Sequence, residues 1–310
     1  MIRLQIVGGG RMGEALLGGL LDARWAEAAD IAVVERVPER RDDLTALFPG
    51  VLVTDAIVQA EGAVIAVKPG DVADTCRALA AAGATRVLSI AAGITTRALQ
   101  DALGPGIACV RAMPNTPAVV RAGAAAIAAG SSASEADLDW ASSVLEAVGV
   151  VVRVPEDKLD AVTGLSGSGP AYVFVMAESM IEAGVLVGLP RDVAEVLAVQ
   201  TLLGSASLLE SSDEAAASLR AQVTSPGGTT AAGLRVLESG GFRSAVLDAV
   251  AAATERSREL GQDRPPRPTG NVWSRWRTTT PFPSCPTTGA SMSSSVSCTR
   301  SSVPSLRRCA

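Results

Sequence analysis

Short apolar runs alternate with longer stretches of helical periodicity in the first half of the chain. Strands separated by single helices predict a parallel, doubly wound α/β sheet of the Rossmann type. Each helix returns the chain to the end of the sheet where the previous strand began, so the next strand runs in the same direction. The expected strands are Ile2–Val7, Ile31–Val34, Val51–Val53, Ala63–Val67, Arg86–Ile90, Ile107–Arg111, Ala124–Ala128 and Val150–Val154.

The pattern changes after Pro155, and from there to Leu260 only helical segments follow. Tyr172–Val187 is apolar nearly all round, so it must be buried in a bundle or against another subunit. We favour a dimer interface over a self-contained bundle. The expected helices are Glu156–Thr163, Pro170–Val187, Arg191–Leu209, Asp213–Ala221, Thr229–Glu238 and Phe242–Leu260.

The chain ends in a segment of different composition, with no acidic residue after Asp263 and with Ser, Thr, Pro and spaced arginines. That composition is typical of disorder. A nucleic-acid arm is the alternative, but the segment has no lysine. We therefore expect a Rossmann domain at 1–155, an all-helical substrate and dimerisation domain at 156–261, and a disordered or non-native tail at 262–310.

Length and charge narrow the classes of function. With 310 residues, 48% of them hydrophobic, the chain can form two domains with cores of their own. A net charge of −5 indicates neither nucleic acid nor an anionic membrane as partner. No run approaches the roughly 18 apolar residues of a membrane helix, and Met1–Val7 leads directly into a strand rather than a signal peptide. We expect a cytoplasmic protein.

Several kinds of catalytic site are excluded by residue type. The chain has no histidine, which excludes Ser-His-Asp and Cys-His sites and the common zinc sites. Its five cysteines lack paired spacing, so we expect neither a disulfide framework nor a metal site. The only lysines are Lys68 and Lys158.

A glycine motif follows the first expected strand and opens a helix. Gly8, Gly10 and Gly13 have the spacing of the dinucleotide fingerprint: a tight turn, close approach of a pyrophosphate, and packing of helix on strand. Glu35 ends the second strand, where an acidic side chain can accept hydrogen bonds from the adenosine ribose. Arg36 could instead hold a 2′-phosphate, so NADH and NADPH both stay open. The alternative is another α/β turn with incidental glycines.

Three more strands end in loops of small or polar residues: Val67-Lys68-Pro69, Ala91-Ala92-Gly93 and Met113–Pro117. Ligands of such sheets bind at the carboxyl ends of the strands, so these loops are expected to line the nicotinamide half of the cofactor. Taken singly, each loop is better explained as a plain connection between elements.

The stretch Thr224–Thr230 combines a proline, two glycines and two threonines at a helix start. Ser225 can cap the helix, and Pro226 fits its first turn. Gly227 and Gly228 allow another molecule to approach the backbone. The segment therefore predicts a site for a small anion such as a carboxylate, with a well-capped surface helix as the alternative.

Together these motifs resemble the pyrroline-5-carboxylate reductase family, from Ile2 to about Gly261. The segment Val223–Thr230 is close to the specific signature of that family, whereas the first glycine motif is shared by many dehydrogenases. The other matching segments are Ile6–Gly13, Ala66–Pro69, Ser89–Gly93, Arg111–Pro117 and Asp160–Tyr172. Arg11 and Gly70 stand where the family usually has Asn and Gln.

The resemblance implies a reductase that uses NADPH or NADH to convert 1-pyrroline-5-carboxylate to L-proline, the last step of proline biosynthesis. It also implies a homodimer or a larger homo-oligomer built on dimers. The residues implied to bind the cofactor are Gly8, Gly9, Gly10, Arg11, Met12, Gly13, Glu35, Arg36, Val67, Lys68, Pro69, Ala91, Ala92, Gly93, Asn115 and Gln222. Those implied to bind substrate are Glu156, Ser225, Gly228, Thr229 and Thr230.

Thr230 is the expected catalytic residue. Its hydroxyl would orient the imine nitrogen while the helix start at Gly228–Thr230 holds the carboxylate. The imine nitrogen is basic enough to arrive protonated, so no strong general acid is needed and a site without histidine suffices. Positioning is then the main catalytic device.

Two rival functions remain at this point. A β-hydroxyacid dehydrogenase resembles enzymes with a lysine acid/base on a C-terminal helix, but here that domain has only Lys158, at its start. A nicotinamide-binding sensor without turnover would not need the carboxylate pocket of Thr224–Thr230.

Overall fold

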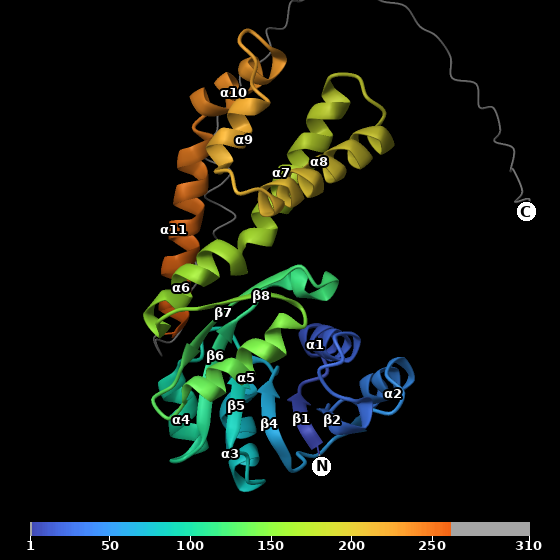
Figure 1. The fold of residues 1–310 in the computed structure, drawn as a ribbon, viewed down its shortest axis with the longest axis vertical. Coiled ribbons are helices and arrows are strands. Elements are labelled where there is room, and N and C mark those ends of the chain that lie inside the picture. Colours follow the sequence, from blue (N-terminus) through green and yellow to red (C-terminus); the bar gives the residue numbers. More distant parts are fainter. Residues whose placement is uncertain (1, 262–310) are drawn as a thin grey trace, which may run out of the picture. The chain divides into compact units, whose positions relative to one another are not determined.

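The computed structural model describes residues 2–261 (Figure 1). The predictions made for the tail, 262–310, lie outside the described residues. Within the described part, an eight-stranded sheet is followed by helices, as the sequence predicts.

The sheet has the strand order β3-β2-β1-β4-β5-β6-β7-β8. The order runs outward from β1 in both directions, so the boundary between β1 and β4 is the topological switch point, where ligands of such sheets bind. The strands are β1 (Ile2–Val7), β2 (Ile31–Val34), β3 (Leu52–Thr54), β4 (Ala60–Ile65), β5 (Arg86–Ser89), β6 (Ala108–Met113), β7 (Gly123–Ala129) and β8 (Gly149–Arg153).

Two strands depart from the predicted parallel sheet, because β8 is parallel to β7 and both run opposite to the other six strands. β7 runs antiparallel to β6, with Val110 opposite Ala129 and Met113 opposite Ala126. The two strands are joined only by the short 3-10 helix η3 (Thr116–Val120). A parallel crossover needs a dozen or more residues, so this connection can only reverse the chain.

Helices cover both faces of the sheet (Figure 1). Residues of α1 (Arg11–Asp22), α2 (Pro38–Leu47) and α5 (Glu135–Glu146) pack in one hydrophobic core, and residues of α3 (Val72–Ala81) and α4 (Thr96–Leu103) pack in the other. Strand residues alternate between the two cores: Leu4 and Ile6 face the first, whereas Val7 and Ile65 face the second. Two layers of helices around a buried sheet explain the continuous apolar runs in the strands.

The remaining elements are mostly helical. The expected segment Glu156–Thr163 is divided into η4 (Glu156–Lys158), α6 (Leu159–Val162) and the start of the π-helix η5 (Thr163–Gly167). The others are α7 (Gly169–Leu186), α8 (Arg191–Ser211), α9 (Ala216–Gln222), α10 (Thr229–Ser239) and α11 (Phe242–Gly261), and the short 3-10 helices η1 (Ala28–Asp30) and η2 (Pro69–Asp71) precede them in the sheet region.

These C-terminal helices bury little of their apolar surface within the chain. α7 has no buried residue, and α8 buries only Ala194 and Ala198. Exposed side chains include Phe174 (62%) and Val196 (68%). Among the described helices, α8 is the one that is long and apolar enough to cross a membrane, with a mean hydropathy of 1.3. Core helices of soluble proteins have the same length and composition.

The end of α11 is fixed against α6 and η5. Ser257 donates a hydrogen bond to Asp160, with 2.6 Å between Oγ and Oδ1. At Gly164 an added Cβ would lie 2.2 Å from the Thr254 hydroxyl, so only glycine lets α11 approach this closely. Tyr172 donates its hydroxyl hydrogen to the Gly164 carbonyl at 3.1 Å. The C-terminal end of α11 therefore has a defined place beside η5.

Candidate active site

The glycine motif forms the turn between β1 and α1, and each of its three glycines has a different environment. Gly8 has a φ of +110°, and a Cβ there would lie 2.5 Å from the Ala66 carbonyl oxygen. A Cβ at Gly13 would lie 2.0 Å from the Gly8 carbonyl oxygen, so helix and turn pack too closely for any side chain. A Cβ at Gly10 would meet nothing within 4 Å.

Gly10 is therefore not required by packing within the chain. It is the N-cap of α1, and no side chain caps that helix. Free N–H groups at a helix start attract anions, and the missing side chain leaves room above them. The turn fits the pyrophosphate of a dinucleotide on these two observations.

This difference gives a matched pair of variants. Gly13→Ala is expected to destabilise the protein by about 3 kcal/mol, because the clash is with backbone. Gly10→Ala is expected to leave stability unchanged and to weaken dinucleotide binding by about tenfold, since its methyl group occupies the open space. Urea unfolding and titration of NADH fluorescence measure the two effects. A Gly10→Ala protein that binds normally would contradict this assignment.

A cavity of about 490 Å³ lies at the switch point, next to this turn. The ends of β1, β2 and β4 form it, and of the predicted cofactor residues Gly8, Gly10, Glu35, Arg36, Val67 and Lys68 line it. Residues that sequence reasoning missed also line it, including Asp55, Ile57, Asp71, Asp74 and Thr75. Asp71 lies two residues after the predicted loop Val67-Lys68-Pro69, and this proximity is the sequence signal that could have identified it.

Glu35 is held at the edge of this cavity by backbone donors. Its Oε2 accepts from the Gly9 N–H at 2.9 Å, and its Oε1 accepts from the Val37 N–H at 2.9 Å. The carboxylate therefore has a fixed place between the glycine turn and the start of α2. Gly9 itself has no room for a side chain, since a Cβ there would lie 2.5 Å from Leu44.

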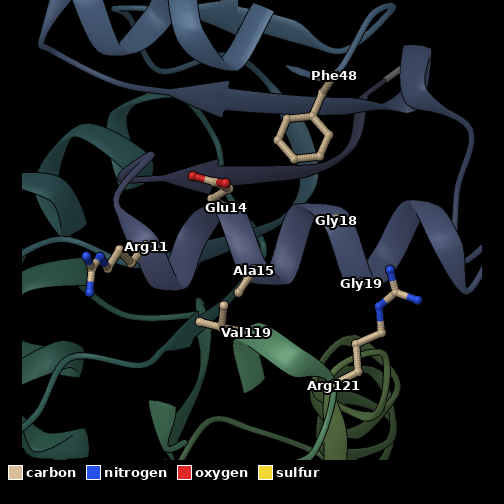
Figure 2. A pocket seen from close by; sticks show the side chains of 8 residues that line it. All are labelled: Arg11, Glu14, Ala15, Gly18, Gly19, Phe48, Val119 and Arg121. Carbon is tan, nitrogen blue, oxygen red and sulfur yellow. The ribbon is translucent and has the colours of Figure 1, made fainter. Parts of the chain in front are cut away.

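Arg11 and Met12 do not line this cavity. Arg11 instead lines a second cavity of about 420 Å³ along α1, with Phe48 and Val119 on either side of the helix (Figure 2). Met12 packs against the hydrophobic core. Of the predicted glycine-turn residues, Gly8 and Gly10 are thus the ones that face the switch-point cavity.

The other strand-end loops have mixed environments. Pro69 begins η2, Ala91 is buried, and Gly93 has a φ of +75°. Ala92 is exposed. A Cβ at Gly93 would lie 3.9 Å from the Cβ of Leu260, so this loop adjoins the C-terminal end of α11.

Asn115 has both ends of its amide engaged within the chain. Nδ2 donates to the Ser166 carbonyl at 3.1 Å, and Oδ1 accepts from the Ala124 N–H at 2.9 Å. The side chain links the end of β6 to η5 and β7. It borders a small apolar cavity with Pro117, Pro170 and Phe174.

Glu156 lies at the start of η4 in a network that sequence reasoning missed. Its Oε1 accepts from the Thr96 N–H at 2.6 Å and is 3.1 Å from Nη1 of Arg111, whose side chain is 7% exposed. The Thr96 hydroxyl also donates to Glu156. Burial opposes ionisation, but the hydrogen bonds from Thr96 and the charge of Arg111 outweigh it, and the pKa of Glu156 is lowered. Glu156 thus joins α4 and β6 to the first helical segment.

The lowered pKa predicts how stability depends on pH. A carboxyl with a depressed folded pKa stabilises the protein fully above its ordinary pKa of about 4.3, and this is lost as pH falls through the folded value. The stability difference between wild type and Glu156→Gln is therefore expected to shrink as the pH falls from 7 to below 4. Urea unfolding of both proteins across this range tests it. A constant difference would show that the charge of Glu156 contributes nothing.

The segment Ser225–Gly228 forms a turn rather than the capped first turn of a helix. The Gly228 N–H donates to the Ser225 carbonyl at 3.0 Å, and Gly227 has a φ of +70°. Pro226 then occupies the second position of a type II turn. α10 begins only at Thr229, with Gly228 as N-cap and no side-chain cap, so the prediction that Ser225 caps it is wrong.

Without a cap, the first N–H groups of α10 are available to an anion. Ser225, Thr229 and Thr230 are exposed. The local geometry is therefore compatible with the predicted carboxylate site, although it is reached by a different turn.

This segment is far from the loop at Gly93 along α11. Leu260 at one end of α11 adjoins Gly93, and α10 precedes the other end (Figure 1). A helix of 20 residues spans about 30 Å, and the 11 residues of α10 span about 16 Å. Even if α10 ran fully antiparallel alongside α11, Thr229 would lie well short of the end of α11 that adjoins Gly93. Gln222 is engaged elsewhere, donating to Glu214 at 2.7 Å.

Other reactive groups within residues 2–261 offer no competing site. Burial raises the pKa of Cys76 and of Cys109 to about 11, so neither is a thiolate at neutral pH. Lys158 is exposed and pairs with Asp157 at 2.7 Å. In this part of the chain no cluster of His, Cys, Asp or Glu could hold a metal ion.

Comparisons with known proteins cover both halves of the described chain. The family model for pyrroline-5-carboxylate reductase dimerisation matches residues 156–260, and that for NADP oxidoreductase, coenzyme F420-dependent, matches 3–93. A pyrroline-5-carboxylate reductase of Synechocystis is 47% identical over 266 residues, covering 84% of this chain and 99% of the relative. One of Mycobacterium tuberculosis is 47% identical over 288 residues, covering 84% and 97%.

Solved structures agree with these relatives. A pyrroline-5-carboxylate reductase from Coxiella burnetii is similar with a TM-score of 0.80 and 36% identity, covering 84% of this chain and 98% of that one. A Plasmodium falciparum pyrroline carboxylate reductase with NADP bound has a TM-score of 0.74 and 29% identity, with the same coverage.

Proposed function

The chain belongs to the pyrroline-5-carboxylate reductase family, and from this we infer that it reduces 1-pyrroline-5-carboxylate to L-proline with NADPH or NADH. It is an oxidoreductase that acts on a C=N bond, in the last step of proline biosynthesis. The observation that supports this most is that one chain carries both an open dinucleotide turn at Gly10 and an uncapped helix start at Thr229.

The dinucleotide supplies the hydride, and the residues of the chain position the partners. Gly8 and Gly10 would leave space for the pyrophosphate, and Glu35, which lines the same cavity, would hold the ribose. The N–H groups at the start of α10 bind the substrate carboxylate, assisted by Ser225. The Thr230 hydroxyl accepts a hydrogen bond from the protonated imine nitrogen and so orients the ring. Since the nitrogen already carries its proton, no general acid is needed.

The remaining predicted residues have supporting roles in this proposal. Lys68 lines the nucleotide cavity, and Ala91–Gly93 form a loop at the same edge of the sheet. Asn115 and Glu156 hold the surrounding elements in place through the hydrogen bonds described above. Gln222 precedes the Ser225 turn and donates a hydrogen bond to Glu214 of the same chain.

The activity is tested by following NAD(P)H absorbance with 1-pyrroline-5-carboxylate. Substrate-dependent oxidation is expected with at least one of the two dinucleotides, and L-proline is the expected product. Binding of the dinucleotide without oxidation would instead favour a sensor.

We further propose that the working enzyme is a homodimer or an assembly of dimers. The supporting evidence is the dimerisation family model on 156–260 and the exposed apolar surface of α7 and α8. The span of α11 adds a reason, since the Ser225–Thr230 turn of one chain does not reach its own Gly93 loop. A second copy would supply this turn.

Complementation tests that arrangement. Thr230→Ala and Gly10→Glu are each expected to have only a small residual activity as homodimers. A mixed dimer made by co-expression would combine one intact nucleotide site with one intact turn, and is expected to regain activity. Mixed dimers that stay inactive would place both halves of the site in one chain.

A substitution in the apolar surface is expected to separate the subunits. Val196→Glu puts a charge on α8 at a position that is 68% exposed in the single chain, and a buried unpaired charge is costly. The expected result is a monomer by light scattering, with loss of activity. Val120→Glu is the control, because Val120 is equally apolar and 74% exposed but lies outside 156–260. A dimeric Val196→Glu protein would contradict the proposed interface.

The domain limits are part of the same proposal: residues 1–155 as the Rossmann domain and 156–261 as the substrate and dimerisation domain. The family models match within these limits. A cytoplasmic location is also a prediction, which cell fractionation tests.

A further inference from the structure

We propose that this enzyme prefers NADH to NADPH and that Glu35, with Asp71, sets the preference by excluding a 2′-phosphate. The inference rests on the proposed function. It concerns the cavity at the switch point, where the adenosine end of a dinucleotide lies in such folds.

The position of Glu35 carries the first part of the argument. Hydrogen bonds from the N–H groups of Gly9 and Val37, each 2.9 Å long, hold its carboxylate at the end of β2. A ribose 2′-hydroxyl can donate a hydrogen bond to such a carboxylate. A 2′-phosphate is mostly deprotonated at neutral pH and carries a charge of about −1.5 to −2, so the carboxylate repels it.

The arginines that follow Glu35 in the sequence already have partners within the chain. Arg36 is 3.0 Å from Asp71 between Nη2 and Oδ1. Arg40 donates to the Gly9 carbonyl at 2.8 Å and pairs with Glu14.

Arg41 is engaged in the same way. It donates to the Glu35 and Arg36 carbonyls at 3.0 and 2.9 Å. A phosphate would therefore compete with Asp71 for Arg36, whose side chain is 75% exposed, and with backbone carbonyls for Arg40 and Arg41.

The charges lining the cavity point in the same direction. Of its ionisable side chains, the cations are Arg36 and Lys68 and the carboxylates are Glu35, Asp55, Asp71 and Asp74. An excess of carboxylates disfavours an added dianion and leaves a neutral hydroxyl unaffected, so the two dinucleotides differ in affinity.

Equilibrium binding to the full chain tests the proposal, with NADH and NADPH titrated separately by fluorescence. The wild type is expected to bind NADH at least about tenfold more tightly. Glu35→Gln is expected to lower the NADH-to-NADPH affinity ratio by about tenfold, chiefly through tighter NADPH binding. Asp71→Asn is expected to lower it too, because it frees Arg36 and leaves the glycine turn untouched.

Glu27→Gln is the matched control. It removes the same charge at an exposed position that precedes β2, whereas Glu35 follows that strand. The substitution is expected to leave the NADH-to-NADPH affinity ratio unchanged. Equal or tighter binding of NADPH by the wild type, or a ratio that neither Glu35→Gln nor Asp71→Asn alters, would overturn the proposal while the proposed function stands. Failure of both dinucleotides to bind would overturn both.

Discussion

Alanine at Thr230 is expected to lower kcat by about 10²-fold, the usual effect of removing one positioned hydrogen-bonding group from a site. The hydroxyl lies at the start of α10, outside the residues that line the nucleotide cavity. Dinucleotide affinity is therefore expected to stay nearly unchanged. Steady-state kinetics with 1-pyrroline-5-carboxylate, together with NADH fluorescence titration, measure both quantities.

Thr230→Ser is the matched control, because it keeps the hydroxyl and removes only a methyl group. It is expected to retain most of the activity. Because Thr230 is exposed in the single chain, its loss should not unfold the protein. Unchanged turnover in Thr230→Ala would refute the catalytic role, and equal losses in both variants would assign the effect to packing.

Removing the carboxylate of Glu156 is expected to cost about 3 kcal/mol of unfolding free energy. Glu156→Gln leaves Arg111, 7% exposed, without its counter-charge and weakens the bonds to Thr96. Breaking a buried pair typically costs about 3–5 kcal/mol, and the partial exposure of Glu156 places it at the low end. In a protein of this size we expect the melting temperature to fall by roughly 6–12 °C.

A surface ion pair of the same type gives the control. Glu135 lies 2.9 Å from Arg153 but its side chain is 83% exposed, so Glu135→Gln is expected to change stability by less than about 0.5 kcal/mol. Combining Glu156→Gln with Arg111→Met removes both buried charges and is expected to recover part of the loss. If Glu156→Gln changes the unfolding free energy as little as Glu135→Gln does, the hydrogen bonds and ion pair of Glu156 do not stabilise the protein.

Local sequence patterns determined most of the fold. The strand and helix positions follow from hydrophobic period, and the turn at Gly8–Gly13 follows from a motif whose steric reason is local. The family also follows from contiguous motifs, since each depends on residues adjacent in the chain. The antiparallel β7 was missed, although the short connection from β6 already excludes a parallel crossover.

The tertiary structure decided which polar groups meet. Glu156 joins Thr96 and Arg111, and Glu35 receives N–H groups from Gly9 and Val37.

Pairs such as Arg36 with Asp71 depend on strands that the sheet, not the sequence, brings together. The length of α11 likewise separates Thr230 from the loop at Gly93. Residues close along the chain are fixed by local sterics and periodicity, whereas partners distant along the chain are fixed only when the packed core sets the distances between elements.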